Sequence, residues 1–359
     1  MNRIRRNTIG MFDCLKGLAM LGVIFFHSYM DVWAAGQYEF TTIGYKLIST
    51  MPAPAIGILF LISGYGFSPI RKKKSFVTQV KLLLKPCVIV LFCAILVRIP
   101  LNLAMGQPPF AGAWLRILGF LLGSLSYTSI FQIPVYSILV FWYLIALFLA
   151  WLLLSLIFHL FSKTGARTAA VGVCVLAGAI LSLLKIKVPF CIIPTLLAIG
   201  FLYLGYMIKK NKWLFVKLPW WLYLVMAAFS LVILKCGEMN IGTGVMKLWL
   251  LDYAGMLCTC YLGLRLYLFL YCPDWKIYTP FAYLGRNSLL ILCLHGFEHL
   301  VFEWKTYEIL TKYAPDLTAC ALGLVRTAII LCCFFVVLFL QRCIKKGKLA
   351  RADKKAGQA

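Results

Sequence analysis

Long runs of apolar residues restrict most strongly what this chain can fold into. Residues 321–340, for example, contain a single charge, Arg326. About 20 apolar residues span the hydrocarbon layer of a bilayer as a helix, whereas a transmembrane β-barrel shows short alternating segments. Hydrophobic residues fill 63% of the 359 positions and charged residues only 13%, too few to cover a soluble globule. The sequence therefore predicts an all-α fold, a polytopic bundle of transmembrane helices.

About ten helices fit the apolar runs, and we predict one membrane domain over residues 1–345. The predicted helices are residues 10–32, 47–69, 84–105, 134–160, 168–184, 190–208, 219–236, 246–271, 279–301 and 319–342. Segment 108–134 is apolar but interrupted by glycine, serine and arginine, so we interpret it as a re-entrant or interfacial segment on the outer side. Residues 346–359 are polar and basic, and we expect a disordered cytoplasmic tail.

Basic residues gather at the ends of the apolar runs. The clusters fall at residues 3–6, 71–74, 209–212 and 342–355. This is the positive-inside pattern that sets membrane orientation, and it places both termini in the cytoplasm. The same clusters contribute 17 of the 36 Lys and Arg residues behind the net charge of +25, and they would attract anionic lipid headgroups. We therefore expect a multi-pass protein of the cell membrane, with no nucleic-acid partner.

Three ionisable residues lie in the first predicted helix, and such groups are costly inside a membrane. Asp13 and Lys16 are three residues apart, so they share a helix face and can pair. Lys16 and His27 also share a face, about 16 Å apart along the axis, because eleven residues make nearly three full turns. A cation near the inner surface and an imidazole deeper in the membrane suit a molecule that enters from the cytoplasm. In that arrangement His27 is a general base or nucleophile. Alternatively, Lys16 only reaches the headgroups and His27 only hydrogen-bonds within the bundle.

A second polar group lies in the ninth predicted helix. His295 and His299 are four residues apart and can share one helix face, which raises the possibility of a metal site. Zinc needs three or four ligands with oriented partners, and this pair alone falls short, so we expect no metal. We interpret His295 as facing a polar cavity, and His299, beside Glu298, as lying at the outer interface.

A third group joins Ser63 and Gly64 to the basic residues that follow them. Small residues let helices approach closely, which is the structural interpretation of this pair. Arg71, at the end of the predicted helix, and Lys81 come next, and such cations bind phosphates well. We predict that Arg71 is the better phosphate ligand, and that Lys72 to Lys74 serve mainly to orient the chain in the membrane.

In this order, these features resemble the acyltransferase family 3 membrane proteins. That family has a basic residue, ten intervening residues and a histidine in its first helix, which Lys16 and His27 match. Residues 63–64 with their basic run, the Phe-Trp-Tyr-Leu of 141–144 and segment 284–295 are similar to its later motifs. The family more often has arginine where this chain has Lys16, and lysine lacks the bidentate geometry of arginine. The resemblance covers residues 10–340, and the family typically has ten helices.

The resemblance implies an acyltransferase that takes an acyl group from cytoplasmic acetyl-CoA. The acceptor would be a hydroxyl on the other side of the membrane, such as one on a cell-surface glycan. His27 would act as general base or transient acyl carrier, His295 would position or polarise the reacting groups, and Lys16 completes the predicted catalytic set. The residues implied to bind the donor are Arg71, Lys16, Asp13, Ser63 and Lys81.

A small-molecule permease is the alternative, because a bundle with buried charges also suits transport. Dependence on an acyl thioester distinguishes the two functions. A scaffold without catalysis would have little use for ionisable side chains inside the membrane.

Overall fold

The computed structural model describes residues 2–36, 52–70, 73–125, 128–130, 133–272, 274–301 and 315–356. Its helices are α1 (Asn2–Gly36), α3 (Pro52–Tyr65), α4 (Lys73–Gln79), α5 (Lys85–Ala104), α6 (Ala113–Leu121), α7 (Trp142–Leu160), α8 (Thr164–Leu183), α9 (Ile192–Lys210), α10 (Trp220–Cys236), α11 (Leu250–Leu270), α12 (Tyr278–Arg286), α13 (Ser288–Val301) and α14 (Pro315–Ala356). A π-helical turn, Val80–Leu84, joins α4 to α5, and a 3₁₀ turn, Leu139–Phe141, leads into α7. Two short antiparallel hairpins pair β1 (Thr128–Ile130) with β2 (Ile133–Val135) and β3 (Met239–Asn240) with β4 (Val245–Met246).

The helical membrane architecture is confirmed. Among the described residues, seven helical segments are long and apolar enough to cross a membrane, and α3, α10 and α13 are shorter apolar helices. Together, the seven long segments and the three shorter helices correspond to the ten predicted helices. Large apolar side chains on α5 and α14 face outward, including Phe92 at 62% and Phe335 at 54% exposure. Apolar surfaces of this extent suit lipid rather than water.

Two predicted boundaries need correction. The ninth predicted helix is broken into α12 and α13 at Asn287, whose side-chain amide donates to the Tyr283 carbonyl (2.9 Å). Asparagine commonly ends helices, because it tolerates conformations that other residues avoid. The backbone of residues 346–356, which we expected to be disordered, is helical and continues α14. Extending an existing helix costs far less than nucleating a new one, and Lys, Arg and Ala are good helix formers.

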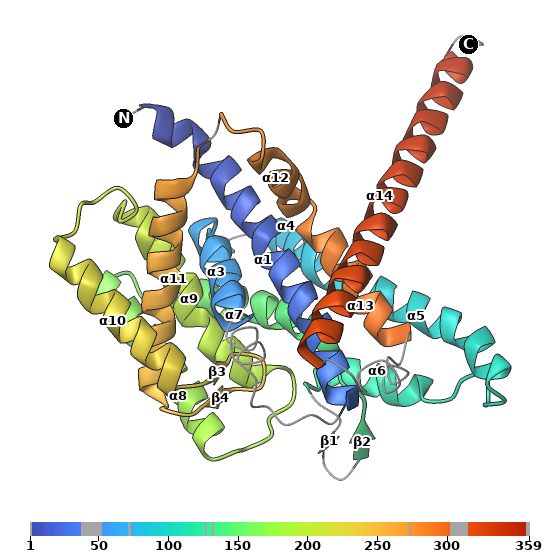
Figure 1. Ribbon diagram of the computed structural model, residues 1–359, viewed down its shortest axis with the longest axis horizontal. Coiled ribbons are helices and arrows are strands. Elements are labelled where there is room, and N and C mark those ends of the chain that lie inside the picture. Colours follow the sequence, from blue (N-terminus) through green and yellow to red (C-terminus); the bar gives the residue numbers. More distant parts are fainter. Residues whose placement is uncertain are drawn as a thin grey trace.

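The two ends of the chain lie at the same end of the bundle, and both hairpins lie toward the opposite end (Figure 1). Combined with the positive-inside pattern, this arrangement places the termini on the cytoplasmic side and the hairpins on the outer side. Segment 108–134, predicted to be re-entrant or interfacial, contains α6 and leads into the β1–β2 hairpin at the outer end.

Helix α1 joins two hydrophobic clusters. Its cytoplasmic half, from Met11 to Leu15, packs into a cluster built largely from α3, α7, α9 and α11. Its outer half, from Ala19 to Ile24, packs into a second cluster built largely from α5, α13 and α14. The helix that carries Lys16 and His27 therefore packs against both clusters, and about half of its span from Gly10 to Asp31 is buried.

Glycines bring α3 and α9 into backbone contact. A Cβ atom on Gly64 would lie 2.0 Å from the Leu202 carbonyl oxygen, and one on Gly205 would lie 2.0 Å from the Leu61 carbonyl oxygen. The structural interpretation of Gly64 is therefore confirmed, because only glycine leaves room for this crossing.

We expect Gly64→Ala to destabilise the protein by about 1–3 kcal/mol, because a backbone oxygen cannot move aside as a side chain can. The measurement is the thermal unfolding temperature of the detergent-solubilised protein. Gly172→Ala on α8 is the matched control, since its Cβ would meet no atom within 4 Å. Equal unfolding temperatures for the two variants would contradict this prediction.

Candidate active site

Three histidine rings converge toward the outer end of the bundle. His27 comes from α1, and His295 and His299 come from successive turns of α13. The centroid of the His27 ring lies 5.5 Å from that of His295 and 5.7 Å from that of His299, and the two α13 rings are 4.5 Å apart. His295 is fully buried. The side chain of His299 is only 9% exposed, so our prediction that it lies at the outer interface was wrong.

A buried arginine from α14 holds two carboxylates beside these rings. Arg326 donates to both oxygens of Glu298 (2.6 and 2.8 Å) and to Asp31 at the end of α1. Its guanidinium also lies 3.1 Å from Nε2 of His299. The Arg326 side chain is 4% exposed, and that of Glu298 is 11% exposed. Asp31, Glu298 and Arg326 form one network, which ties α1, α13 and α14 together.

Among the described residues, the network has an excess of negative charge. Two carboxylates face one guanidinium, so with neutral histidines this described group carries a net charge of minus one. Carboxylates also lie beside the rings: Nδ1 of His299 is 3.6 Å from Asp31, and Nδ1 of His295 is 3.6 Å from Glu298. This arrangement stabilises positive charge that develops on an imidazole during a reaction, as the aspartate of a serine-protease triad does.

His295 has ring nitrogens that are available for a ligand. Within the described part of the chain, neither its Nδ1 nor its Nε2 has a hydrogen-bond partner, and the 3.6 Å separation from Glu298 is longer than a hydrogen bond. A fully buried imidazole without partners is uncommon in proteins, because desolvation without a hydrogen bond is costly. A polar group of a substrate would satisfy it.

The same residues resemble a metal-ligand set. The ligand atoms of His295, Glu298 and His299 all lie within 4.8 Å of one another. However, Arg326 already bonds both Glu298 oxygens and contacts His299. A divalent cation there would need to displace or face a guanidinium, so the donor set fits a metal poorly.

We therefore expect dialysis of the purified protein against a chelator to leave its activity and unfolding temperature unchanged. The comparison is with the same preparation after zinc is restored. Activity that falls on chelation and returns with zinc would show that the three side chains hold a metal after all.

At the cytoplasmic end, a carboxylate holds two cations. Asp13 pairs with Lys16 (2.8 Å), as predicted, and also with Arg286 at the end of α12 (3.2 Å). The crossing of α1 and α12 brings them together, because Gly17 and Gly285 let the two backbones touch. The side chains of Lys16 and Arg286 are 30% and 65% exposed. The group carries one net positive charge and is open to an anion.

The other predicted donor-binding residues are more dispersed. Ser63 donates its hydroxyl to the Leu59 carbonyl of its own helix (2.8 Å). Lys81 lies exposed in the π-helical turn before α5. Arg71 lies outside the described residues. The role of these three residues stays a prediction.

The predicted motif at 141–144 connects the separate groups. The Phe141 ring lies against Gly296, where a Cβ would be 2.3 Å from it, and so supports the turn that carries His295. Trp142 lies against Gly242 of the β3–β4 hairpin, and the Tyr143 ring lies 4.8 Å from the Phe60 ring of α3. The start of α7 thus contacts the outer hairpin, α3 and the histidine helix.

A family model described as an acyltransferase domain, Acyl_transf_3, matches residues 9–344. The chain belongs to this family. It is a membrane acyltransferase, and the match extends over α1 to α14 and includes both charged groups. Searches of curated proteins and of solved structures gave no match.

Sequence reasoning did not assign a role to several residues of this acyltransferase. Arg326 had a usable signal, since it is the one charge in residues 321–340, and a charge inside a membrane helix is a functional candidate. Arg286 lies in a motif that we singled out, but its partner Asp13 is 273 residues away. His299 and Glu298 were recognised and assigned to the wrong environment, because spacing within one helix says nothing about which other helices surround it.

Proposed function

We propose that this acyltransferase moves an acetyl group from cytoplasmic acetyl-CoA to a hydroxyl of an extracytoplasmic acceptor such as a cell-surface glycan, with His27 as general base. The observation that carries the proposal is the convergence of His27, His295 and His299 on a buried network with excess negative charge. The family match supports acyl transfer itself.

The donor would lie along α1. Lys16 and Arg286 at the cytoplasmic end would bind its phosphates, since cations form strong charge-assisted hydrogen bonds with them. From Lys16 to His27 the helix rises about 16 Å, a distance that the extended thiol arm of coenzyme A would span. Arg71, Ser63 and Lys81 would line the same approach, and Asp13 would hold the two cations in place.

In the proposed reaction, the acceptor oxygen bonds to the thioester carbonyl carbon while His27 takes the hydroxyl proton. The carbon–sulfur bond then breaks, and the coenzyme A thiolate leaves and takes the proton back from the imidazolium. The products are the acetyl ester and the free thiol. Asp31 and Glu298, which lie beside His299 and His295, would stabilise positive charge in this histidine group. The nitrogens of His295, which have no hydrogen-bond partner among the described residues, would bind the reacting oxygen.

The test is transfer of labelled acetyl from acetyl-CoA to cell-envelope material by the purified protein in vesicles. The proposal predicts labelled ester that mild alkali releases, together with an equal amount of free coenzyme A thiol. Label retained on His27 of the protein, found by mass spectrometry after quenching, would instead assign it as an acyl carrier. No ester with any envelope preparation would overturn the proposal and favour transport.

Removing either cytoplasmic cation is expected to weaken donor binding. Lys16→Gln and Arg286→Gln should each raise the KM for acetyl-CoA roughly tenfold with a smaller change in kcat, because the lost contact binds the donor before and during the reaction. Lys217→Gln, an exposed lysine of the α9–α10 loop, is the control. An unchanged KM in both site variants would remove this end of α1 from donor binding.

A further inference from the structure

A cavity of about 430 Å³ opens at the hairpin end of the bundle, and its lining residues are distinct from the histidine group. Its walls come from residues 123–125 after α6, from the loop between α8 and α9, and from the β3–β4 hairpin up to Trp249. The size falls within the range of small-molecule sites, which are mostly apolar with a few polar groups. This cavity lies on the side where the proposed acceptor would be.

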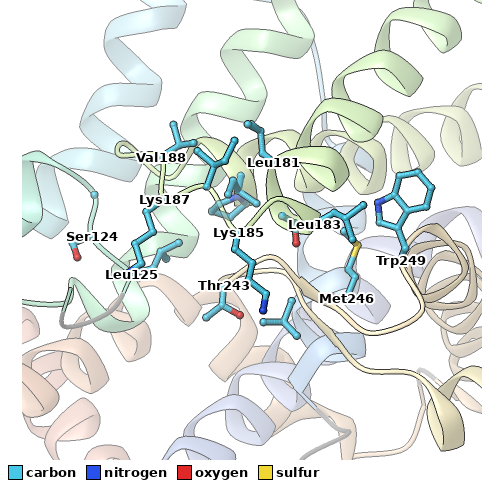
Figure 2. Close-up of a pocket in the computed structure, with 16 residues that line it drawn as sticks. Ser124, Leu125, Leu181, Leu183, Lys185, Lys187, Val188, Thr243, Met246 and Trp249 are labelled. Atoms are coloured by element: carbon cyan, nitrogen blue, oxygen red, sulfur yellow. The ribbon is translucent and has the colours of Figure 1, made fainter. Parts of the chain in front are cut away.

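The described lining carries two positive charges and no acidic side chain. Lys185 and Lys187 lie on the α8–α9 loop, with the hydroxyls of Ser182 and Thr243 on the surrounding walls. Figure 2 shows the Lys185 amine directed toward the Thr243 side of the cavity. Lysines are depleted from outer loops by the positive-inside rule, so this pair runs against the general charge distribution of the chain.

The backbone of Lys185 has a conformation that is uncommon for a lysine. The Lys185 amide bonds to the Ser182 carbonyl and the Ile186 amide to the Leu181 carbonyl (2.9 and 3.1 Å), a Schellman motif that ends α8. Lys185 occupies the left-handed position of this motif, with φ of 52°, where glycine is the usual residue. Five other described non-glycine residues, Leu139 and Lys212 among them, also have positive φ, so the conformation assigns no function by itself. It does show that glycine can replace Lys185 without backbone strain.

The cavity is physically connected to the histidine group. The Ser124 carbonyl in its wall accepts from the Ile138 amide (2.8 Å), and the Leu125 carbonyl accepts from the Ser137 hydroxyl (3.2 Å). Three residues further along, Phe141 packs against Gly296, the neighbour of His295. Residues 137–141 therefore join residues 124–125 of the cavity wall to the turn of α13 that carries His295.

We propose that this cavity is the acceptor subsite and that it binds an anionic sugar unit, one carrying a carboxylate or a phosphate, through Lys185 and Lys187. The inference rests on the proposed function for the acceptor's role, but the binding itself requires no acyl transfer. An apolar wall would pack against the sugar ring while the two ammonium groups hold its charge.

The test measures binding of three soluble sugars that differ in charge, namely glucose, glucuronate and glucose 1-phosphate, to the full chain in nanodiscs by calorimetry without acetyl-CoA. We expect the two anions to bind and glucose to bind at least tenfold more weakly. The variant Lys185→Gln/Lys187→Gln should bind the anions roughly tenfold more weakly, because two exposed ion pairs are lost. Lys276→Gln, an exposed lysine at the cytoplasmic end, is the charge-matched control.

The variant Lys185→Gly tests whether a loss of anion binding comes from misfolding. Glycine suits the left-handed backbone at this position, and it removes the ammonium group. The variant should keep the unfolding temperature and still lose affinity for the anions. Equal binding of all three sugars, or unchanged binding in the lysine variants, would overturn the acceptor subsite. Anion binding that depends on the lysines, combined with no acetyl transfer to any acceptor, would uphold this subsite and refute the proposed function. Glucuronate binding without glucose 1-phosphate binding, or the reverse, would identify the anion.

Discussion

His27→Ala is expected to lower kcat for acetyl transfer by about 10²–10⁴, the usual contribution of a positioned general base. The loss should be equally large in kcat/KM for the acceptor, because His27 interacts with the reacting proton in the transition state rather than with the bound substrate. The KM for acetyl-CoA should change little, since the proposed phosphate contacts lie at the other end of α1. The measurement is steady-state transfer by the variant and the wild type at matched, folded protein levels.

His159→Ala controls for loss of a histidine in general, because His159 lies exposed at the cytoplasmic end of α7. His295→Ala should reduce kcat as well. The kcat of His27→Ala/His295→Ala should fall by no more than the product of the two single effects, because the two residues act together in one reaction site. Transfer by His27→Ala at the wild-type rate would remove this histidine from the chemistry.

Arg326→Met is expected to destabilise the folded protein by about 3–5 kcal/mol, the largest stability effect in this structure. The substitution leaves Glu298 and Asp31 without their counterion, and breaking a buried ion pair costs far more than the pair contributes. Methionine has a similar volume to the apolar part of arginine, so loss of charge rather than loss of packing dominates. The expected observation is a large fall in unfolding temperature and in the yield of folded protein from membranes.

A double-mutant cycle separates charge from packing at this site. Adding Glu298→Gln to Arg326→Met removes one of the orphaned carboxylates and should recover part of the loss. Arg342→Met, also on α14, changes an exposed arginine that donates to the Tyr283 hydroxyl (3.0 Å), and should shift stability by about 0.5 kcal/mol or less. If Arg326→Met were no less stable than Arg342→Met, the buried network would not support the fold.

The sequence predicted local features well and long-range features poorly. The ten apolar segments follow from the length that a bilayer imposes, so their existence and approximate bounds were accessible. The Asp13–Lys16 pair was accessible because both residues lie on one helix. By contrast, the partners of Arg326 lie on two other helices, 28 and 295 residues away, and no spacing rule connects them. The break at Asn287 had a local signal, in an asparagine two residues after a glycine, that the continuous apolar run concealed.

Helix α1 is held at both ends, by Arg286 near its cytoplasmic end and by Arg326 near its outer end. Because Lys16, one of the proposed phosphate ligands, and His27 lie on this one continuous helix, their separation is fixed by its rise and cannot adjust to the donor. The fixed distance between Lys16 and His27 then selects for the length of the thiol carrier, not for the length of the acyl group. Thioesters on a short thiol that lacks the nucleotide would not be held with their carbonyl at His27, whereas lengthening the acyl chain leaves the carbonyl in the same place. Carrier selectivity would therefore be strict even where the choice of acyl group is set elsewhere.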